Sequence, residues 1–152
     1  MLPLLVLFPF IITTTHQVSE KGPVYQIRVM EQRIKYCLEK NSKAVCDDIF
    51  SPESTIQFAD RNISGTDEIN SYLYGLMSRV GNFELVNHLI TSASDDNFQA
   101  NGTMVQSNQN CTEISDYLAK FESMKKGYKL SFLKVFGIQS GDKECKCIIC
   151  PQ

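Results

Sequence analysis

Residues 44–76 constrain the fold more than any other stretch, because they predict a helix, a strand, a turn and a second helix in one short run. Apolar residues at helical spacing from Val45 to Phe50 indicate the end of a helix. Pro52 should end this helix, since proline lacks a backbone donor and disfavours helical angles in the residue before it. Ile56 and Phe58 then alternate with polar neighbours, which is typical of a half-buried strand over residues 55–59.

The second helix of this stretch has clear start signals. Residues 62–65 predict a turn, Thr66 is a suitable N-cap, and Asp67 and Glu68 favour the positive end of a helix dipole. The apolar positions that follow at helical spacing are Ile69, Leu73, Leu76 and Val80. This pattern predicts a helix with one buried face.

The rest of the chain divides into one long helix before this stretch and several strands after it. An apolar stripe at helical spacing covers residues 24–39, and residues 43–50 predict a short second helix that Ser42 could cap. Alternation or apolar runs predict strands over residues 83–92, 98–106, 112–123 and 128–138, with a hairpin at 125–127. Two or three helices with a curved antiparallel sheet of four to six strands indicate an α+β fold.

Three details of the predicted strands bear on the shape of the sheet. Residues 83–92 carry apolar side chains on both faces, so we expect this strand to be covered on both. Gly102 interrupts the next strand, and we expect a glycine bulge there rather than a hairpin. Alternation in the last strand slips after Phe132, which predicts a bulge or a strand covered on both faces.

Phe50, the Pro-Glu-Ser-Thr-Ile run that follows it, and Gly65 opening a helix with Ile69 and Tyr72 define an order of elements. This order resembles the nuclear transport factor 2-like superfamily, which includes ketosteroid isomerases and SnoaL-type cyclases, over residues 24–140. The resemblance implies a cone-shaped fold in which a curved antiparallel sheet wraps around a long N-terminal helix, with two further short helices. The superfamily includes isomerases, cyclases, dehydratases, carriers and interaction modules, so the fold leaves the function open.

A cone of this kind has an apolar interior, which favours binding of an apolar small molecule. The residues that we expect to line the cone wall are Ile34, Phe58, Tyr117 and Phe132. A protein partner on the outer face of the sheet is the other form of the binding hypothesis. A homodimer through that face is a separate hypothesis, and the apolar residues expected there are Val86, Ile90, Leu118 and Leu133.

The isomerase branch of the superfamily needs a carboxylate base, a helical tyrosine and a protonated aspartate. In the register set by Phe50, the base position falls at Phe58 and the tyrosine position at Ile34, and neither side chain can move a proton. Only Asp116 offers a match to the aspartate. We therefore predict a domain without a catalytic centre of the family type. The alternative is an acid–base enzyme of the isomerase, cyclase or dehydratase type that uses His88 with Asp116.

Charge and motifs exclude several other classes of function. The formal net charge of −2 gives no basic surface for nucleic acid, and no stretch of the chain after the apolar first residues could span a bilayer. The sequence contains no phosphate loop and no zinc-protease motif, so it predicts no cofactor and no metal.

The first residues indicate secretion. Residues 1–15 contain an uncharged apolar run from Leu2 to Ile12, which predicts a signal peptide, and residues 16–23 predict a flexible N-terminus. The alternative is a buried N-terminal strand of a cytosolic protein. Glycosylation sequons occur at Asn62, Asn101 and Asn110, and the even cysteine count suits an oxidising compartment. We therefore expect a secreted, extracellular glycoprotein.

The six cysteines are best explained as disulfide partners, and they are Cys37, Cys46, Cys111, Cys145, Cys147 and Cys150. A zinc site would need a second Cys-x-x-Cys pair, and a redox site would need this motif at the start of a helix. Neither condition is met in the tail, residues 141–152. We expect the tail cysteines to bridge to the body rather than to one another. Cys37 and Cys46 could instead pair across the break between their helices, so the connectivity stays open.

Overall fold

The computed structural model describes residues 22–141 and 145–152, and the predicted leader lies outside these residues. The helices are α1 (Pro23–Glu39), α2 (Lys43–Cys46) and α3 (Thr66–Met77). The strands are β1 (Phe50–Gln57), β2 (Asn62–Ser64), β3 (Asn82–Ala93), β4 (Asn97–Ser107), β5 (Thr112–Met124) and β6 (Gly127–Ser140). None of the helices in these ranges is long and apolar enough to cross a membrane.

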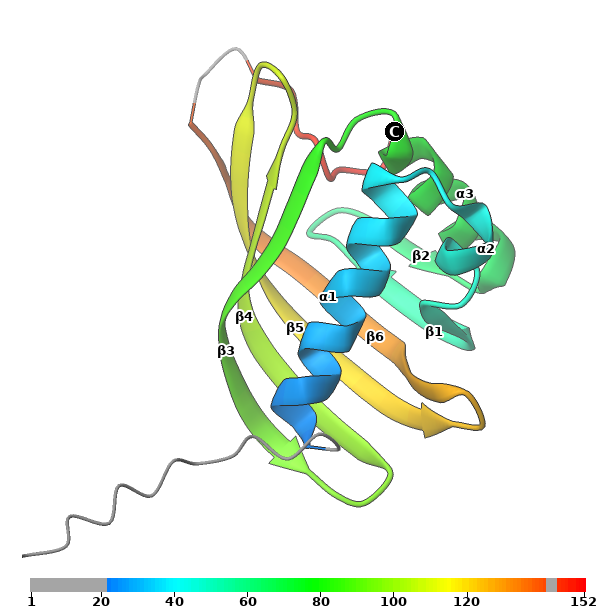
Figure 1. Ribbon diagram of the computed structural model, residues 1–152. Coiled ribbons are helices and arrows are strands. Elements are labelled where there is room, and N and C mark those ends of the chain that lie inside the picture. The colour runs from blue at the N-terminus through cyan, green and yellow to red at the C-terminus, as the bar shows by residue number, and fades with distance from the viewer. Residues whose placement is uncertain (1–21, 142–144) are drawn as a thin grey trace, which may run out of the picture.

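The strands form one curved sheet in the order β2-β1-β6-β5-β4-β3, and all neighbours are antiparallel except β1 and β6. Helix α1 crosses the concave face of this sheet, and α2 and α3 lie beside its β1 end (Figure 1). This arrangement confirms the predicted α+β cone. It leaves the inner face of β3 to β6 directed toward the helices, where the apolar interior lies.

The start of β1 corrects the sequence prediction. The chain is already extended at Phe50, so residues 51–53 belong to a strand rather than to a helix end. β1 pairs with β6 at Phe50 and again from Thr55, with a register shift between these positions. Pro52 lies within this interruption, where a missing backbone donor removes no ladder hydrogen bond.

The cap of α3 is also different from the prediction. Gly65, with φ of 81°, occupies the N-cap position, and Thr66 is the first helical residue. A positive φ of this kind favours glycine, because a side chain there would clash with the backbone. The buried face of α3 is confirmed at Ile69, Leu73 and Leu76.

β3 is not covered on both faces, because it is the last strand of the sheet and extends beyond the helices. Only Phe83 and Leu85 are buried in it, and Leu89 is 61% exposed. The pairing also corrects the predicted outer face. Ile90 lies opposite the buried Ala100, so it points inward.

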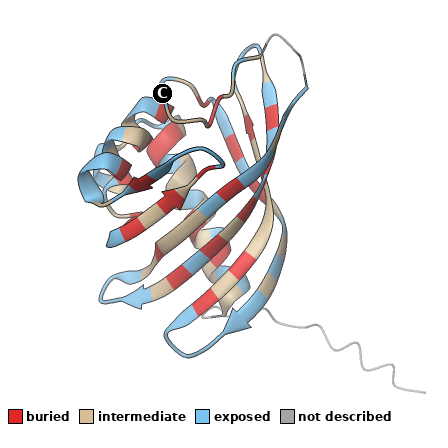
Figure 2. Cartoon of the chain, turned by 180° about the vertical axis from the view of Figure 1, so that it is seen from behind, coloured by how far each residue is buried: buried red, intermediate tan, exposed pale blue. Residues whose placement is uncertain are grey.

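The same pairing places Leu133 opposite the buried Ala119, so this side chain also points inward. Val86 and Leu118 remain on the outer face, as predicted, since they neighbour inward-facing residues along their strands. Seen from behind, buried and exposed positions alternate along the strands (Figure 2).

The glycine bulge predicted at Gly102 in β4 is wrong, because the bulge lies in the neighbouring strand β3. β4 pairs with β5 without interruption through Gly102, while two residues of β3, Asn87 and His88, lie opposite it. Asn87 has φ of 56°, which marks the bulged residue. The last strand does contain a bulge, but it lies before Phe132 rather than after it, because the register of β5 and β6 shifts between Leu130 and Phe132.

Three disulfides join Cys37 to Cys46, Cys111 to Cys145, and Cys147 to Cys150. The first joins α1 to α2 across the break between them, a pairing that the sequence left open. The second bridges the tail to the body, as expected. The third contradicts the expectation that tail cysteines would not bridge one another, since three residues of separation allow a tight ring with Cα atoms 5.4 Å apart.

Candidate functional site

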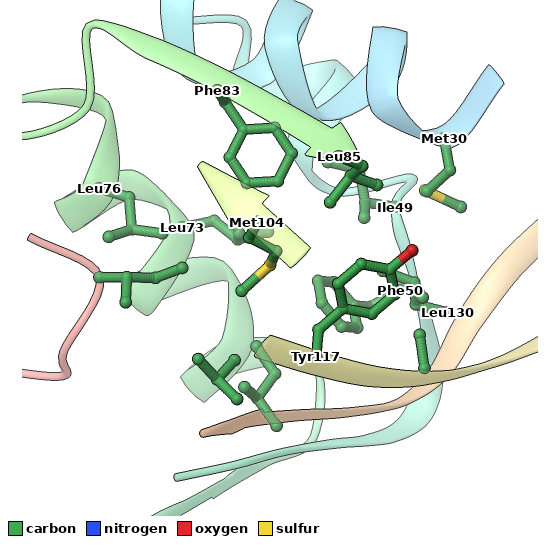
Figure 3. Close-up of a cluster of buried hydrophobic side chains, with 14 of the residues drawn as sticks. Met30, Ile49, Phe50, Leu73, Leu76, Phe83, Leu85, Met104, Tyr117 and Leu130 are labelled. Carbon is green, nitrogen blue, oxygen red and sulfur yellow. The ribbon is translucent and has the colours of Figure 1, made fainter. Parts of the chain in front are cut away.

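A cavity lies between α1, α3 and the inner face of the sheet, with a volume of about 50 Å³. Figure 3 shows part of the buried cluster around it, with Met30, Phe83, Leu85, Met104 and Tyr117 labelled. The other apolar side chains of its lining include Ile34, Leu38, Phe50, Ile56, Leu73, Leu76, Val80, Phe121, Leu130, Leu133 and Ile149. The interior is therefore almost entirely hydrocarbon and sulfur.

Two of the four residues expected in the cone wall line this cavity, and two lie elsewhere. Ile34 reaches it from α1 and Tyr117 from β5. Phe58 is buried against the ring of Tyr72, with ring centroids 5.7 Å apart. Phe132 lies opposite Lys120 on the outer face, where the Lys120 ammonium sits 5.5 Å from its ring.

The predicted dyad of His88 and Asp116 is not formed. Tyr117 is buried on the inner face, so its neighbour Asp116 points to the outer face, where it is exposed and lies 3.5 Å from the Thr103 hydroxyl. His88 Nδ1 instead lies 3.0 Å from the hydroxyl of Tyr117. The acid and the imidazole are therefore on opposite faces of one sheet.

The buried Tyr117 and three half-buried side chains, His88, Glu31 and Lys35, form a group that we call the helix-side cluster. The Lys35 ammonium lies 2.8 Å from the Glu31 carboxylate, one turn along α1, and this contact raises the pKa of Lys35. Burial lowers the pKa of His88 and, with the nearby Glu31, raises the pKa of Tyr117 to about 12. Both groups are therefore neutral at physiological pH.

Gly102 makes room for Tyr117. A Cβ atom on this residue would lie 2.9 Å from Tyr117 Cε1 and 2.9 Å from the Val86 carbonyl oxygen. The tyrosine ring crosses β4 over a residue without a side chain and so reaches His88 on β3. The Asn-Gly pair therefore serves close packing rather than a turn.

A second polar group, which sequence analysis missed, is fully buried beside the cavity. We call it the tail cluster: Gln106, Glu113 and Ser115 of the sheet with Ile148 and Ile149 of the tail. The three polar side chains are 0% exposed. Gln106 Nε2 donates to Glu113 Oε1 at 2.7 Å and also lies 3.3 Å from Ser115 Oγ. The alternation of β5 could have indicated that Glu113 and Ser115 are buried, because they lie on the same face of the strand as Tyr117.

Glu113 also holds the tail. The backbone N–H groups of Ile148 and Ile149 donate to its two carboxylate oxygens at 2.8 and 3.2 Å. Both donors lie inside the ring closed by the Cys147–Cys150 disulfide, and Ile149 lines the cavity. A buried carboxylate with three donors is well satisfied, so the tail closes this side of the cone.

Two side chains of the body complete the tail contact. Tyr72 donates its hydroxyl to the Ile149 carbonyl at 2.6 Å, and Arg79 donates to the Cys150 carbonyl at 2.8 Å. The tail passes beside α3 at the end of the sheet (Figure 1). These contacts fix a segment that sequence analysis treated only as a source of cysteines.

Other predicted sites occupy the surface. Asn62 and Asn110 are exposed, and Asn101 is half-buried in β4. Within residues 22–141 and 145–152, no three His, Cys, Asp or Glu side chains gather as metal ligands would.

No family model matches the sequence, and no curated protein does. Many solved structures match the fold. A nuclear transport factor 2-like protein of unknown function from Shewanella oneidensis has a TM-score of 0.64 at 9% identity, covering 75% of this chain and 98% of its own. A protein of unknown function from Nostoc punctiforme, described with a cystatin-like fold, has a TM-score of 0.63 at 12% identity, with coverages of 74% and 88%.

An enzyme is also among the similar structures. The hexachlorocyclohexane dehydrochlorinase LinA-type3 from Novosphingobium barchaimii has a TM-score of 0.56 at 12% identity, covering 77% of this chain and 88% of its own. At these identities the comparison shows the fold alone. The chain has the nuclear transport factor 2-like cone fold, and its function must be argued from its own residues.

Proposed function

We propose that this cone-fold domain is a secreted, non-catalytic binding protein that takes an apolar small molecule into its interior. The observation that carries the proposal is the cavity itself, whose lining from α1, α3 and five strands is hydrocarbon and sulfur apart from Gln106 and the hydroxyls of Tyr72 and Tyr117. An apolar lining with few polar groups is typical of small-molecule sites, which in most proteins are larger, about 300–1,000 Å³.

The size of the cavity limits the ligand. A volume of about 50 Å³ has room for about four non-hydrogen atoms, on the basis of the space that one water needs. Met30 and Met104 line it, and methionine side chains turn about three bonds and adapt to irregular guests. A small or narrow molecule is therefore the favoured ligand.

The acid–base alternative is not favoured in the form that uses His88 and Asp116. These side chains belong to opposite faces of the sheet, so no single substrate could contact both.

Homodimerisation through the outer face is a second candidate, and exposed apolar side chains favour it. Leu89 is 61% exposed, Ile114 47% and Phe136 41%. Large side chains of this kind on one sheet face are typical of protein contacts. Asn101 lies on the same face, so a glycan there would compete with a partner.

Secretion is part of the proposal and has independent support. Three disulfides within the described residues are typical of proteins that fold outside the cytosol, where thiols are not kept reduced. The apolar first residues and the three sequons agree with this location.

Native mass spectrometry of the protein secreted from eukaryotic cells tests these points together. We expect loss of the leader, added glycan mass, three intact disulfides and a retained small molecule that leaves on mild activation. A protein that keeps its leader and free thiols would contradict secretion. A ligand-free protein that takes up no apolar molecule offered to it would contradict the binding proposal.

A further inference from the structure

The Cys147–Cys150 disulfide is less enclosed by the fold than the disulfide between the first two helices. Cys37 and Cys46 are both 0% exposed, so a thiol in solution cannot reach their sulfurs without opening the core. Cys147 and Cys150 are half-buried and belong to the tail, which passes beside α3 at the end of the sheet (Figure 1). Exposed disulfides are the ones that thiols reduce, whereas enclosed structural disulfides resist reduction.

Loop length separates the same disulfide from Cys111–Cys145, whose cysteines are also half-buried. Cys147–Cys150 spans three residues and Cys111–Cys145 spans 34. A disulfide that closes a short loop restricts the unfolded chain less, and so it stabilises the fold less. By thermodynamic linkage, the fold in turn stabilises that disulfide less against reduction. Cys147–Cys150 is therefore the pair that a thiol should reduce first.

The backbone of the ring favours the release of one of the two sulfurs. The N–H group of Cys150 donates to Cys147 Sγ at 3.1 Å. A hydrogen bond to the charged form of a group stabilises that form, and a more stable thiolate leaves faster in thiol–disulfide exchange. An incoming thiolate should therefore attack Cys150 Sγ and release the sulfur of Cys147.

The ring closed by this disulfide also closes one side of the cavity. The N–H groups of Ile148 and Ile149, inside the ring, donate to the buried Glu113 carboxylate at 2.8 and 3.2 Å. Ile149 itself lines the cavity. Reduction removes the covalent constraint that keeps these two N–H groups together, so the tail segment should leave Glu113 more often.

We propose that the Cys147–Cys150 disulfide is a site of reversible exchange with low-molecular-weight thiols such as glutathione, and that its reduction loosens the tail over the cavity. Residues 147–150 do not open a helix, so the reaction is exchange at this disulfide rather than thioredoxin-type catalysis. The inference goes beyond the proposed function and holds whatever the cavity binds.

The exchange takes two steps. A glutathione thiolate attacks Cys150 Sγ, the bond between the two protein sulfurs breaks, and its electron pair stays on Cys147 Sγ. A second glutathione thiolate attacks the glutathione sulfur of the mixed disulfide and releases the Cys150 thiolate. Two glutathione molecules are thereby oxidised to one disulfide, and their two protons pass through water to Cys147 and Cys150.

A redox titration of the intact, disulfide-bonded protein tests the site. The protein is equilibrated with reduced and oxidised glutathione and quenched with acid, and its thiols are alkylated and located by peptide mass spectrometry. The titration variable is the square of the reduced concentration divided by the oxidised concentration. We expect its midpoint to be about thirtyfold lower for Cys147 and Cys150 than for Cys111 and Cys145. Removal of glutathione should restore the disulfide.

Three results of the titration would overturn the proposal: reduction of both pairs at one midpoint, earlier reduction of Cys111–Cys145, or failure of the disulfide to re-form. A trapped glutathione adduct should lie on Cys150. An adduct confined to Cys147 would overturn the proposed order of attack.

Two single variants test the hydrogen bond to sulfur. Cys150→Ser leaves Cys147 as a free thiol that can still accept from the N–H of residue 150, and Cys147→Ser is the matched control with Cys150 free. The rate of alkylation is measured against pH, because its midpoint reports how easily the thiol ionises whatever its exposure. We expect the lower midpoint in Cys150→Ser, and equal midpoints would overturn the role of the N–H group. Urea unfolding verifies that each variant is folded, and the wild-type titration remains decisive if one is not.

Hydrogen exchange of the selectively reduced protein tests the effect on the tail. The N–H groups of Ile148 and Ile149 should exchange about tenfold faster than in the oxidised protein, while those of β4 and β5 keep their rates. Equal exchange at Ile148 and Ile149 in the two forms would overturn the proposed loosening. Acceleration throughout the sheet would also overturn it, because the whole fold rather than the tail would then depend on this disulfide.

Discussion

The tail cluster and the helix-side cluster lie on the same strand and are organised in opposite ways. Glu113 and Tyr117 are four residues apart on β5, about 13 Å along the strand, and both point inward. The side chains of the tail cluster are sealed from solvent, and two tail N–H groups converge on its carboxylate. In the helix-side cluster only Tyr117 is buried; the other three side chains are half-buried, and the two charges are paired along α1.

This difference separates polar side chains that stabilise the fold from polar side chains whose hydrogen-bond partners can change. A sealed carboxylate must keep every donor, because an unpaired buried charge is costly. The half-buried His88, Glu31 and Lys35 can exchange partners with water at low cost, whereas the Tyr117 ring beside them is buried. We therefore expect substitutions in the tail cluster to change stability and those in the helix-side cluster to have small effects.

The largest expected effect comes from Glu113→Ala. The substitution leaves the N–H groups of Ile148 and Ile149 and the amide of Gln106 without their acceptor, so the free energy of unfolding should fall by about 3–5 kcal/mol. Chemical denaturation measures this change. Glu53→Ala, at an exposed position of β1, should stay within about 0.5 kcal/mol of the wild type. Equal stability of Glu113→Ala and wild type would remove the distinction between the clusters.

The disulfides of the tail should rank by the length of chain that they close. Cys111–Cys145 spans 34 residues and Cys147–Cys150 spans three. Replacing both cysteines of a pair by serine should cost about 4 kcal/mol for the first and about 2 kcal/mol for the second. Denaturation of each double variant tests the order. In both variants, hydrogen exchange at Ile148 and Ile149 should accelerate, and unchanged protection would show that the hydrogen bonds of Glu113, Tyr72 and Arg79 hold the tail without the disulfides.

Two glycine-to-alanine substitutions test how tightly Tyr117 of the helix-side cluster is packed, one beside its ring and one on the exposed side of α3. Gly102→Ala places a methyl group 2.9 Å from Tyr117 and the Val86 carbonyl, so it should cost about 1–3 kcal/mol. Gly75→Ala on α3 meets only Arg79, at 3.9 Å, and should stabilise the helix by about 0.5–1 kcal/mol. Thermal or chemical unfolding measures the change in stability of both variants. A destabilising Gly75→Ala or a neutral Gly102→Ala would contradict the packing described here.

The smallest expected effect is the pH dependence due to His88. Burial lowers its pKa below the ordinary value of 6.5, with Glu31 opposing the shift and Arg28 assisting it. The folded state therefore takes up a proton less readily than the unfolded chain, and the contribution of His88 to stability is lost as pH falls from about 6.5 through the lower folded pKa.

Urea midpoints near about pH 7.5 and about pH 5.5 measure this loss. The midpoint of the wild type should fall more between these conditions than that of His88→Gln, because the glutamine does not titrate. Identical slopes in the two proteins would show that the imidazole is not desolvated in the folded state.

Local patterns predicted the elements well but not the contacts between distant segments. The apolar stripe of α1, the phase of β5 and the presence of a bulge near Phe132 follow from periodicity, which is a property of neighbouring residues. The strand through Pro52 was missed because its tolerance depends on an interruption in the pairing with β6, which no local signal reports.

The candidate site shows the same limit. Ile34 and Tyr117 could be placed inside from their element faces. The phase of β5 places Glu113 on the inner face, but its partners cannot be known until the tail docks on it, and that contact joins residues 35 positions apart. Phe132 was assigned to the inner face because the bulge beside it reverses the alternation.

Diffraction from a crystal held under xenon pressure tests the central claim, a dry apolar cavity inside the cone, most directly. Xenon binds to apolar cavities without polar contacts. We predict a xenon atom between α1, α3 and the inner face of β4 and β5, in contact with Leu73, Met104 and Tyr117. Xenon found only on the outer face, or ordered water filling the space between these side chains, would contradict the account.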